Sequence, residues 1–578
     1  MNQITVLING KECRAPEGST ILEAARANDI DIPTLCYLKE INEIGACRMC
    51  VVDVVGAKNL VTSCVYPIKE GMEIETNSER VFQSRKTNLE LVLSTHEKTC
   101  LSCARSGNCE LQRLCKTFNV ADEDHYNGEN YDYEFDDSSV HMSRNNNKCI
   151  LCRRCVAVCS NWQDVGVIGA NNRGFKTHIG CAFDKDLGDV ACISCGQCIV
   201  VCPTGAITEK DQSESVWQVL ADPRKHVIVQ TAPSTRVTLG EAFGVPIGTN
   251  VEGKMVAALR TLGFDRVFDT NVAADFTIME EANEFVERVN NQGPFPMFTS
   301  CSPGWVKYCE SYYPELIPNL SSCKSPQQMF GALAKTWYAE KIGVDPQDIY
   351  VVGIMPCTAK KFEVGREDEA ASGFSDVDVA LTTRELARMI EKAGIRFVEL
   401  EDQTFDDPFG EATGAGYIFG ASGGVMEAAL RTASDVLAGQ STDFDFKEVR
   451  GMAGIKEATY DLSGTSIRVA AVSGMANAKK LLRRIQEGEL YHFVEVMGCP
   501  GGCINGGGQP VQPASVRNFI DLKRKRAAGL YAEDQVKKIR KSNDSPIVQL
   551  VYNDFLGEPG SPKAHRILHT SYQERSEF

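Results

Sequence analysis

The sequence has no apolar run long enough to cross a membrane as a helix. No stretch of its 578 residues approaches the roughly 18 consecutive apolar residues that such a helix needs. The opening residues, MNQITVLING, alternate like a β-strand and lack a charged leader followed by an apolar core, so we expect no secretory signal. We therefore expect the protein to be cytoplasmic.

Basic residues are fewer than acidic ones. The chain has 61 Lys and Arg against 77 Asp and Glu, a net charge of −16. A nucleic-acid-binding protein needs a basic face, so this balance argues against that class. No G-x-G-x-x-G or Walker-type loop occurs in a suitable context either, so we do not expect the chain itself to bind a nicotinamide cofactor.

Cysteine, by contrast, is abundant, with 24 in the chain. Eighteen of them lie between Cys13 and Cys202, many in pairs that are separated by two residues. In a large chain without a leader, this grouping predicts metal centres and not disulfides. The other six lie further along the chain and are Cys301, Cys309, Cys323, Cys357, Cys499 and Cys503.

Residues 1–78 predict a small β-rich domain with a metal site. A polar turn between ITVLING and KECRAPEG predicts a β-hairpin, and STILEAARAND predicts a helix that is capped by Ser19 and Thr20. Four cysteines follow, with Cys47 and Cys50 as a C-x2-C pair in GACRMC and with Cys36 and Cys64 on either side. Their spacing favours an iron–sulfur cluster with four thiolate ligands over a structural zinc site, which is the alternative. This segment resembles the 2Fe–2S ferredoxin domain that begins the large iron–sulfur subunit of respiratory complex I and iron hydrogenases. The candidate ligands are Cys36, Cys47, Cys50 and Cys64.

Residues 79–137 contain the pattern H-x3-C-x2-C-x5-C. One imidazole and three thiolates are able to hold a 4Fe–4S cluster, and the nitrogen ligand changes the charge and potential of the cluster. A zinc knuckle with the same ligands is the alternative. The spacing resembles the 4Fe–4S module that follows the 2Fe–2S domain in both families named above. The candidate ligands are His96, Cys100, Cys103 and Cys109.

Residues 138–208 contain the pattern C-x2-C-x2-C-x3-C twice, in CILCRRCVAVC and CISCGQCIVVC. Two such runs are typical of ferredoxins with two 4Fe–4S clusters, in which the fourth cysteine of each run binds the other cluster. One cluster is therefore predicted on Cys149, Cys152, Cys155 and Cys202. The second is predicted on Cys192, Cys195, Cys198 and Cys159.

Residues 209–517 predict an α/β catalytic domain with largely parallel sheets, preceded by the α+β ferredoxin-like domains. Strand-like runs such as HVIVQTAP and IYVVGIMPC alternate here with amphipathic helical runs such as GKMVAALRTLG. Ligands bind beyond the carboxyl ends of parallel strands, and three predicted strands end at Cys301, Cys357 and Cys499. Residues 518–578 are charged and amphipathic and predict a small C-terminal helical segment.

Three motifs in this region resemble the signatures of the catalytic domain of FeFe hydrogenases: TSCSPGW, MPCTAKKFE and EVMGCPGGCINGGG. The resemblance, with the same order of cluster modules in front, covers nearly the whole chain. It implies reversible H2 oxidation and proton reduction at an H-cluster, a 4Fe–4S cubane bridged by a thiolate to a di-iron unit with CO, CN and a dithiolate. By match, Cys357, Cys499 and Cys503 bind the cubane, and Cys503 bridges to the di-iron unit.

The chain departs from the family at Ser302. The family usually reads TSCCP, with the first cysteine relaying protons and the second binding the cubane. The match puts Cys301 in the proton position and Ser302 in the ligand position, although a serine oxygen is a poor ligand for a soft metal site. Three explanations stay open: Cys301 binds the cubane and Ser302 relays the proton, Ser302 binds through oxygen, or Cys323 supplies the missing thiolate.

The resemblance also implies roles for polar and apolar residues around the site. Glu281, Glu284 and Arg288 have the spacing of one helical face, which alone would also fit a solvated face with salt bridges. By match they form a proton relay towards Cys301 together with Ser321, and Lys360 donates to a cyanide. The residues that resemble the family's pocket lining are Ser234, Gln327, Met355, Phe419 and Met497.

The predicted function is that of an iron hydrogenase whose electrons pass through four accessory clusters, one 2Fe–2S and three 4Fe–4S. The expected partners are ferredoxin, NAD(P)H- and flavin-binding or iron–sulfur partner subunits of an electron-bifurcating complex, and the maturation proteins that build the di-iron unit. Two alternatives are a non-catalytic electron conduit of the complex I type and a sensory hydrogenase with little turnover. A conduit would have no need of Cys357, Cys499 and Cys503.

Overall fold

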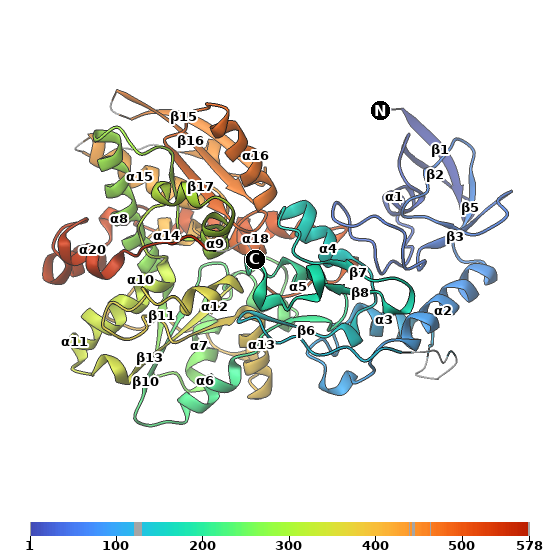
Figure 1. Ribbon diagram of the computed structural model, residues 1–578, viewed down its shortest axis with the longest axis horizontal. Coiled ribbons are helices and arrows are strands. Elements are labelled where there is room, and N and C mark those ends of the chain that lie inside the picture. Colours follow the sequence, from blue (N-terminus) through green and yellow to red (C-terminus); the bar gives the residue numbers. More distant parts are fainter. Residues whose placement is uncertain are drawn as a thin grey trace.

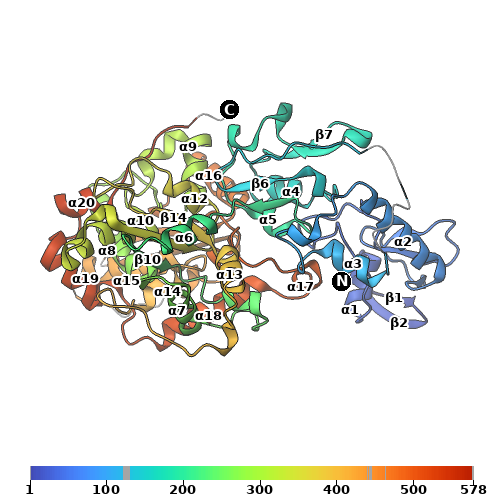
Figure 2. The ribbon, with the colours of Figure 1, turned by 90° about the horizontal axis from the view of Figure 1, so that it is seen from below.

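The computed structural model divides into an α/β part and an extended row of small cysteine-rich modules. In Figure 1 the modules lie on the right, with the N-terminal sheet and α2 at the far end, and Figure 2 shows the same separation from below. The residues described are 2–120, 126, 130–438, 440–441, 446–462 and 464–575. Among these residues no helix is long and apolar enough to span a membrane.

The N-terminal module is a five-stranded sheet with one helix. Strands β1 (Gln3–Ile8) and β2 (Lys11–Pro16) form the predicted antiparallel hairpin. The sheet order is β2-β1-β5-β3-β4, which includes β3 (Val51–Val54), β4 (Val61–Thr62) and β5 (Glu73–Glu75). Helix α1 (Ile21–Ala27) begins at Thr20, and a capping box stabilises its first turn, as the sequence predicted.

The next modules consist mainly of short helices and loops. Helices α2 (Glu79–Ser94) and α3 (Glu110–Thr117) flank the histidine-containing motif. Helices α4 (Arg154–Ala157) and α5 (Gln197–Val201) carry the two repeated cysteine runs. Strands β6 (Met142–Arg144) and β9 (Ile207–Glu209) pair antiparallel and close this module, and β7 (Gly169–Asn171) pairs with β8 (His178–Gly180).

The α/β part contains two sheets, and the first is entirely parallel. Its order is β11-β10-β13-β14, with β10 (His226–Thr231), β11 (Arg266–Asp269), β13 (Ile349–Met355) and β14 (Val379–Thr382). Alternate residues of β10 face opposite cores, because Cβ atoms alternate along a strand. Val227 and Val229 pack towards α7 (Glu252–Leu262) and α13 (Thr383–Lys392), and Ile228 packs towards α8 (Thr270–Asn290) and α10 (Pro326–Leu333).

The second sheet has the order β12-β17-β16-β15 and is parallel except at one edge. Strands β12 (Met297–Phe298), β17 (Phe493–Met497) and β16 (Thr465–Ser473) run parallel, and β15 (Ile455–Leu462) pairs antiparallel with β16. Helix α15 (Gly424–Ala438) covers one face, and α9 (Pro303–Tyr312) and α16 (Met475–Gln486) cover the other. The predicted α/β class with largely parallel sheets is confirmed, although the sequence did not indicate β15.

The C-terminal segment packs on the α/β part as helices and an extended tail. Its helices are α18 (Leu522–Val536), α19 (Pro546–Val551) and α20 (Pro562–Leu568). Residues 568–570 then lie beside residues 322–324: the Lys324 amide donates to the Leu568 carbonyl at 2.8 Å, and the Thr570 amide donates to the Ser322 carbonyl at 2.8 Å. A segment from the end of the described chain therefore forms part of the wall around residues 321–324.

Candidate functional site

The four thiols predicted for the first cluster come from the loop after α1, the residues just before β3 and the residues just after β4. The Sγ atoms of Cys50 and Cys64 are 3.3 Å apart. The Cys36 amide donates to Cys47 Sγ at 3.2 Å, which joins the second pair. The charges of Cys36 and Cys47 also raise the pKa of Cys64, so the two pairs lie close to each other. The structure thus brings all four residues into one group with the chemistry of a thiolate cluster site.

The residues of the histidine-containing motif line one cavity. His96, Cys100, Cys103 and Cys109 all face it, and so does Cys115, for which the sequence gave no role. Burial lowers the pKa of His96 to about 4, which leaves the imidazole neutral at pH 7. Its buried Nδ1 has no hydrogen-bond partner. A neutral ring and three thiols are the donor set that the motif predicted.

The two repeated cysteine runs exchange their last members in the structure. Burial raises the pKa of Cys149 to about 12, and the charge of Cys202, from the second run, also raises it. Burial raises the pKa of Cys159 to about 11, and the charge of Cys192, from the second run, raises it further. The first group that the structure assembles is Cys149, Cys152, Cys155 and Cys202. The second is Cys159, Cys192, Cys195 and Cys198.

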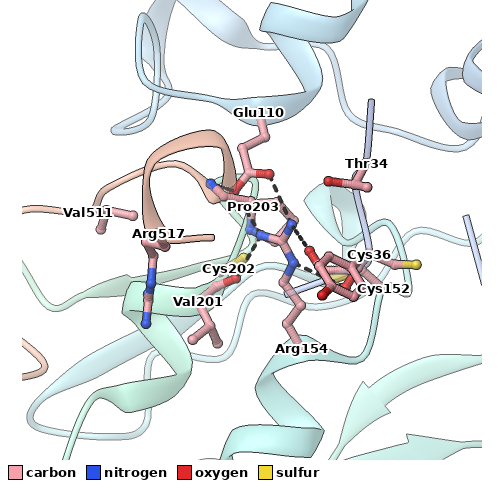
Figure 3. A network of polar contacts seen from close by, with 12 residues as sticks. Thr34, Cys36, Glu110, Cys152, Arg154, Val201, Cys202, Pro203, Val511 and Arg517 are labelled. Atoms are coloured by element: carbon pink, nitrogen blue, oxygen red, sulfur yellow. Dashed lines mark hydrogen bonds and ion pairs between the residues drawn. The ribbon is translucent and has the colours of Figure 1, made fainter. Parts of the chain in front are cut away.

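A buried arginine joins three of these modules (Figure 3). Arg154, on α4, forms an ion pair with Glu110 of α3, with Nη1–Oε1 2.8 Å and Nη2–Oε2 3.0 Å. Its guanidinium also donates to the Cys36 carbonyl at 3.3 Å and to the Tyr37 carbonyl at 3.1 Å, both in the N-terminal module. Figure 3 shows Arg154 between Cys36, Cys152 and Cys202, which belong to two different thiol groups.

Asn42 links the same two groups, because its side-chain amide donates to the carbonyls of Cys36 at 2.9 Å and Cys152 at 3.0 Å. The histidine-containing module also meets this group, since Arg105 donates to the Cys202 carbonyl at 3.2 Å. Both outer modules therefore contact the Cys149–Cys202 group directly. The sequence gave no signal for Asn42, Arg105 or Arg154, because these contacts join residues that lie about a hundred positions apart.

The second thiol group of the two-cluster module touches the catalytic part. The hydroxyl of Thr358, which follows Cys357, donates to the Ser194 carbonyl at 2.7 Å. Cys195 itself lines the catalytic cavity. On the opposite side, the ring nitrogen Nε2 of His141 lies 3.8 Å from Cys192 Sγ, a contact that the sequence did not indicate. The thiol groups thus form a continuous row from the N-terminal module to the catalytic cavity.

The catalytic cavity lies where the carboxyl edges of the two sheets meet. Its volume is about 80 Å3. Strands β10 and β13 of the first sheet and β12 and β17 of the second end at its wall. The sequence-predicted residues that line it are Ser234, Cys301, Gln327, Met355, Cys357, Lys360, Phe419, Met497, Cys499 and Cys503.

Glycines let the loop around Cys503 pack directly on the backbone of neighbouring segments at the cavity wall. A side chain at Gly502 would lie 2.6 Å from the Ser422 amide, and one at Gly506 would lie 2.2 Å from the Pro356 carbonyl. Gly502 also has φ +99°, which favours glycine. The Ser234 hydroxyl and Gln327 Oε1 are buried without a hydrogen-bond partner. Unpaired polar atoms and three clustered thiols fit an iron–sulfur group with polar ligands.

Cys301 and Ser302 occupy different parts of this wall. Burial raises the pKa of the Cys301 thiol, and the charges of Glu281 and Cys503 raise it further. The Ser302 hydroxyl accepts a hydrogen bond of 3.1 Å from the amide of Gly498, the residue before Cys499. Cys301 therefore lies near both Glu281 and Cys503, and Ser302 lies beside the loop that carries Cys499. Cys323 is fully buried and is absent from the cavity lining, which leaves it no place as a replacement ligand.

A buried carboxylate that the sequence did not indicate positions two residues of the cavity. Glu363 pairs with Lys360, and both of its oxygens lie 2.9 Å from Nζ. The same carboxylate accepts from Gln327 Nε2 at 3.0 Å and from the Ser325 hydroxyl at 2.9 Å. With its amide nitrogen held in this way, Gln327 presents its unpaired oxygen to the cavity.

Hydrogen bonds join Ser321, Glu284 and Arg288 of the predicted relay, whereas both oxygens of Glu281 are buried without a hydrogen-bond partner. The Ser321 hydroxyl donates to Glu284 at 2.9 Å, and Arg288 pairs with the other oxygen of Glu284 at 2.6 Å. Burial raises the pKa of Glu281 to about 8, and Glu284 and Glu495 act in the same direction. The charge of Glu281 in turn raises the pKa of Cys301. Arg288 has 11% of its side chain exposed and lies at the outer end.

Family models match this chain in five consecutive segments. The model described as "Iron only hydrogenase large subunit, C-terminal domain" matches residues 225–507. Before it lie a 2Fe-2S iron-sulfur cluster binding domain (1–79), an NADH-ubiquinone oxidoreductase-G iron-sulfur binding region (85–124) and a 4Fe-4S dicluster domain (148–206). After it, residues 520–575 match the model described as "Iron hydrogenase small subunit".

Relatives with the same extent are known. The chain is 47% identical to the NADP-reducing hydrogenase subunit HndD of Solidesulfovibrio fructosivorans, over 100% of both chains. It is 44% identical to iron hydrogenase 1 of Clostridium pasteurianum, over 99% of this chain and 100% of the other. Among solved structures, a variant of the [FeFe]-hydrogenase HydA1 from Chlamydomonas reinhardtii matches with a TM-score of 0.57 and 39% identity, over 64% of this chain and 100% of the other.

Proposed function

The chain belongs to the iron-only hydrogenase family and is an FeFe hydrogenase, and from this premise we propose which residues carry its H2 chemistry and its electrons. The observation that carries the proposal is the cavity between the two sheets, where thiols from separate strand ends meet beside Cys195. An electron conduit would need a row of cluster sites but no such cavity at its end.

Cys357, Cys499 and Cys503 would hold the cubane of the H-cluster. The charges of Cys357 and Cys503 raise the pKa of Cys499, and so does the charge of Cys195 in the neighbouring thiol group. The charge of Cys357 also raises the pKa of Cys503. When bound, the H-cluster supplies the metal centre at which H2 is split or formed. Ser234, Gln327 and Lys360 would hold its polar ligands, because they present hydroxyl, amide and ammonium groups to the cavity. Met355, Phe419 and Met497 would exclude water from it.

Cys301 would pass protons between this site and Glu281. A relay requires groups within hydrogen-bond reach of one another, and a group with a pKa near the working pH passes a proton most readily. Glu281, with a pKa of about 8, meets the second condition. From Glu281 the relay would continue through Ser321 and Glu284, with Arg288 fixing the Glu284 carboxylate at the outer end.

Ser302 would stand in the position of the fourth cubane ligand without supplying a thiolate. Its hydroxyl is held by the Gly498 amide beside Cys499, which supports this placement over an exchange of roles with Cys301. The cubane would then rest on three thiolates and either a weakly bound serine oxygen or no fourth protein ligand. Of the three explanations that the sequence left open, this arrangement agrees with both the location of Cys301 and that of Cys323.

The accessory groups would hold one 2Fe–2S cluster and three 4Fe–4S clusters. Both outer clusters would pass electrons to the cluster on Cys149, Cys152, Cys155 and Cys202, because their modules contact that group through Arg154, Asn42 and Arg105. Electrons would continue through the cluster on Cys192 and Cys195 to the catalytic cavity.

The electron partner would be an NAD(P)-linked assembly or a ferredoxin. A relative of the same length is named as a subunit of an NADP-reducing hydrogenase, which supports partner subunits for this chain as well. We expect those subunits to supply the flavin and nicotinamide sites. Co-purification under anaerobic conditions, followed by H2-dependent reduction of NADP+ by the purified assembly and by this chain alone, would separate the two cases.

Infrared spectroscopy of the anaerobically matured holoenzyme tests the catalytic proposal. We expect bands in the metal carbonyl and cyanide regions that shift between argon and H2. In Cys503→Ser we expect these bands to disappear while the accessory clusters remain. Protein with intact accessory clusters but without carbonyl or cyanide bands would contradict the proposal and would leave the electron conduit.

A further inference from the structure

A thiol, an imidazole and a carboxylate meet at the outer end of the proposed relay. The ligand atoms of Glu284, Cys323 and His569 all lie within 4.8 Å of one another. They come from three distant parts of the chain: helix α8, the loop before α10, and the segment after α20. Cys323 Sγ lies 3.9 Å from Glu284 Oε2. Two ligand atoms of one tetrahedral zinc ion are about 3.3–3.8 Å apart, so this pair is close to the separation that the ion requires.

The imidazole is held as metal-binding histidines are held in proteins. His569 Nε2 lies 3.0 Å from Glu280 Oε2, and both side chains are buried. Glu280 accepts two further hydrogen bonds, from the Gly560 amide and the Tyr552 hydroxyl, which keep it an acceptor for Nε2–H. A carboxylate behind the histidine fixes the ring and its tautomer, and it increases the basicity of the other nitrogen. The other ring nitrogen, Nδ1, lies on the side of the cluster and pairs with the Ser322 hydroxyl at 2.8 Å, a hydrogen bond that an ion would replace.

The charges around the cluster favour a cation. Glu280 and Glu284 face it from α8, and Arg288 balances only Glu284, through the oxygen that points away from Cys323. A thiol that loses its proton to a metal adds a further negative charge. One sulfur, one nitrogen and one oxygen ligand with a fourth position for water match the preferences of Zn2+ better than those of Mg2+ or Ca2+, which prefer oxygen ligands.

We propose that Glu284, Cys323 and His569 form a Zn2+ site whose occupation slows H2 turnover by blocking the proton relay. The blocking role depends on the proposed path through Glu284. The oxygen that would bind the ion, Oε2, is the one that accepts from the Ser321 hydroxyl at 2.9 Å. A metal ion on this oxygen takes the place of the proton that Glu284 would otherwise pass to Ser321. The electron path lies elsewhere and would be unaffected.

The first test is Zn2+ binding to the anaerobic holoenzyme, measured by equilibrium dialysis with metal analysis. We expect one strongly bound ion per chain, and a loss of affinity of at least tenfold in Cys323→Ala and in His569→Gln. The matched controls are Cys309→Ala, another buried thiol, and His565→Gln, whose ring stacks on His569 at 4.4 Å but is not part of the cluster. Equal affinity in all four variants and the parent would overturn the site.

X-ray absorption at the zinc edge identifies the ligands without interference from iron. We expect one sulfur near 2.3 Å and nitrogen or oxygen ligands near 2.0–2.2 Å. Zinc surrounded by four sulfur atoms would instead show that the ion displaces iron from a cluster, and this result would also overturn the site.

Turnover then tests the block separately from binding. We expect Zn2+ to lower H2 evolution and H2 uptake at least tenfold in the parent, in Cys309→Ala and in His565→Gln, with recovery after a chelator is added. Cys323→Ala and His569→Gln should need at least tenfold more Zn2+ for the same loss, and reduction of the accessory clusters by dithionite should keep its rate. Zinc bound at the site without an effect on turnover would overturn the block and the relay through Glu284, but not the site.

Discussion

Glu110 and Arg154 form a double ion pair, at 2.8 and 3.0 Å, between two cluster-binding modules. Neither side chain is more than 5% exposed. Glu110 also accepts from the Ala514 amide at 3.3 Å, so the pair connects the modules to the segment that follows the catalytic cavity. The pair therefore lies where four parts of the chain meet, beside the thiol group that we propose to receive electrons from both outer clusters.

Replacing one partner of this pair should damage the junction more than replacing both. Glu110→Met and Arg154→Met each leave a buried charge without its partner, which typically costs about 3–5 kcal/mol. We expect either variant to lower the temperature at which the holoenzyme loses activity and to slow reduction of the Cys149 cluster by the 2Fe–2S cluster. The double variant should be closer to the parent than either single one. Additive losses in the double variant would contradict a direct coupling.

Cys202 and Cys159 should each affect the cluster of the other run. We expect Cys202→Ala to remove the same paramagnetic signal as Cys152→Ala, and Cys159→Ala to remove the same signal as Cys195→Ala, because the fourth ligands are exchanged. Iron analysis and EPR of the reduced protein provide the measurement. Cys181, a buried thiol outside both groups, provides the control variant Cys181→Ala, which should keep both signals. If Cys202→Ala matched Cys195→Ala instead, the exchanged pairing would be wrong.

Ser302→Cys should strengthen the binding of the active-site cubane. A thiolate is a far better ligand for an iron–sulfur cluster than a serine oxygen, so we expect slower loss of iron under a chelator and a cubane signal at full occupancy. Ser302→Ala should lose only the 3.1 Å hydrogen bond from Gly498, which is worth about 1 kcal/mol. Iron release that is the same in the parent and in Ser302→Cys would show that this position does not face the cubane.

Glu281 should be protonated at pH 7 and lose its proton near pH 8. Burial and then the charges of Glu284 and Glu495 raise its pKa to about 8, above the ordinary value for glutamate, so the neutral form extends to higher pH. We expect a carboxylic C=O band in infrared difference spectra that fades as the pH rises through 8 and that is absent in Glu281→Gln. Turnover of Glu281→Gln should fall about 10²–10⁴-fold. A carboxyl band that already disappears near pH 5 would contradict this assignment.

The sequence predicted the parts of the site that are local. Cys301, Cys357 and Cys499 each follow a strand-like run, and since parallel strands end at one edge of a sheet, their meeting was predictable. The repeated cysteine runs likewise predicted the exchanged grouping. What the sequence left undetermined was the choice between Cys301, Ser302 and Cys323, because ligand chemistry alone does not say which way a loop turns.

The sequence could not predict the contacts that join distant segments. Arg154 and Glu363 are ordinary charged residues in the sequence, and their roles depend on partners that only the fold supplies. Strand β15 was missed because it is a sheet edge with several exposed polar residues, in which the apolar signal of a buried strand is weak. His569 had one other histidine four residues away and no nearby ligand, and its neighbours in space lie about 250 to 290 positions earlier in the chain.

The pairing of residues 568–570 with residues 322–324 has a consequence for how the enzyme is made. A ribosome completes the walls of the catalytic cavity once Gly506 has emerged, but the segment that covers Ser322 and Cys323 is synthesised about sixty residues later. During that interval the growing chain has all the thiols of its clusters while the outer end of the proton relay is still uncovered. The outer end of the proposed relay is therefore covered late in synthesis, after all the thiols that we propose for the iron–sulfur clusters have been made.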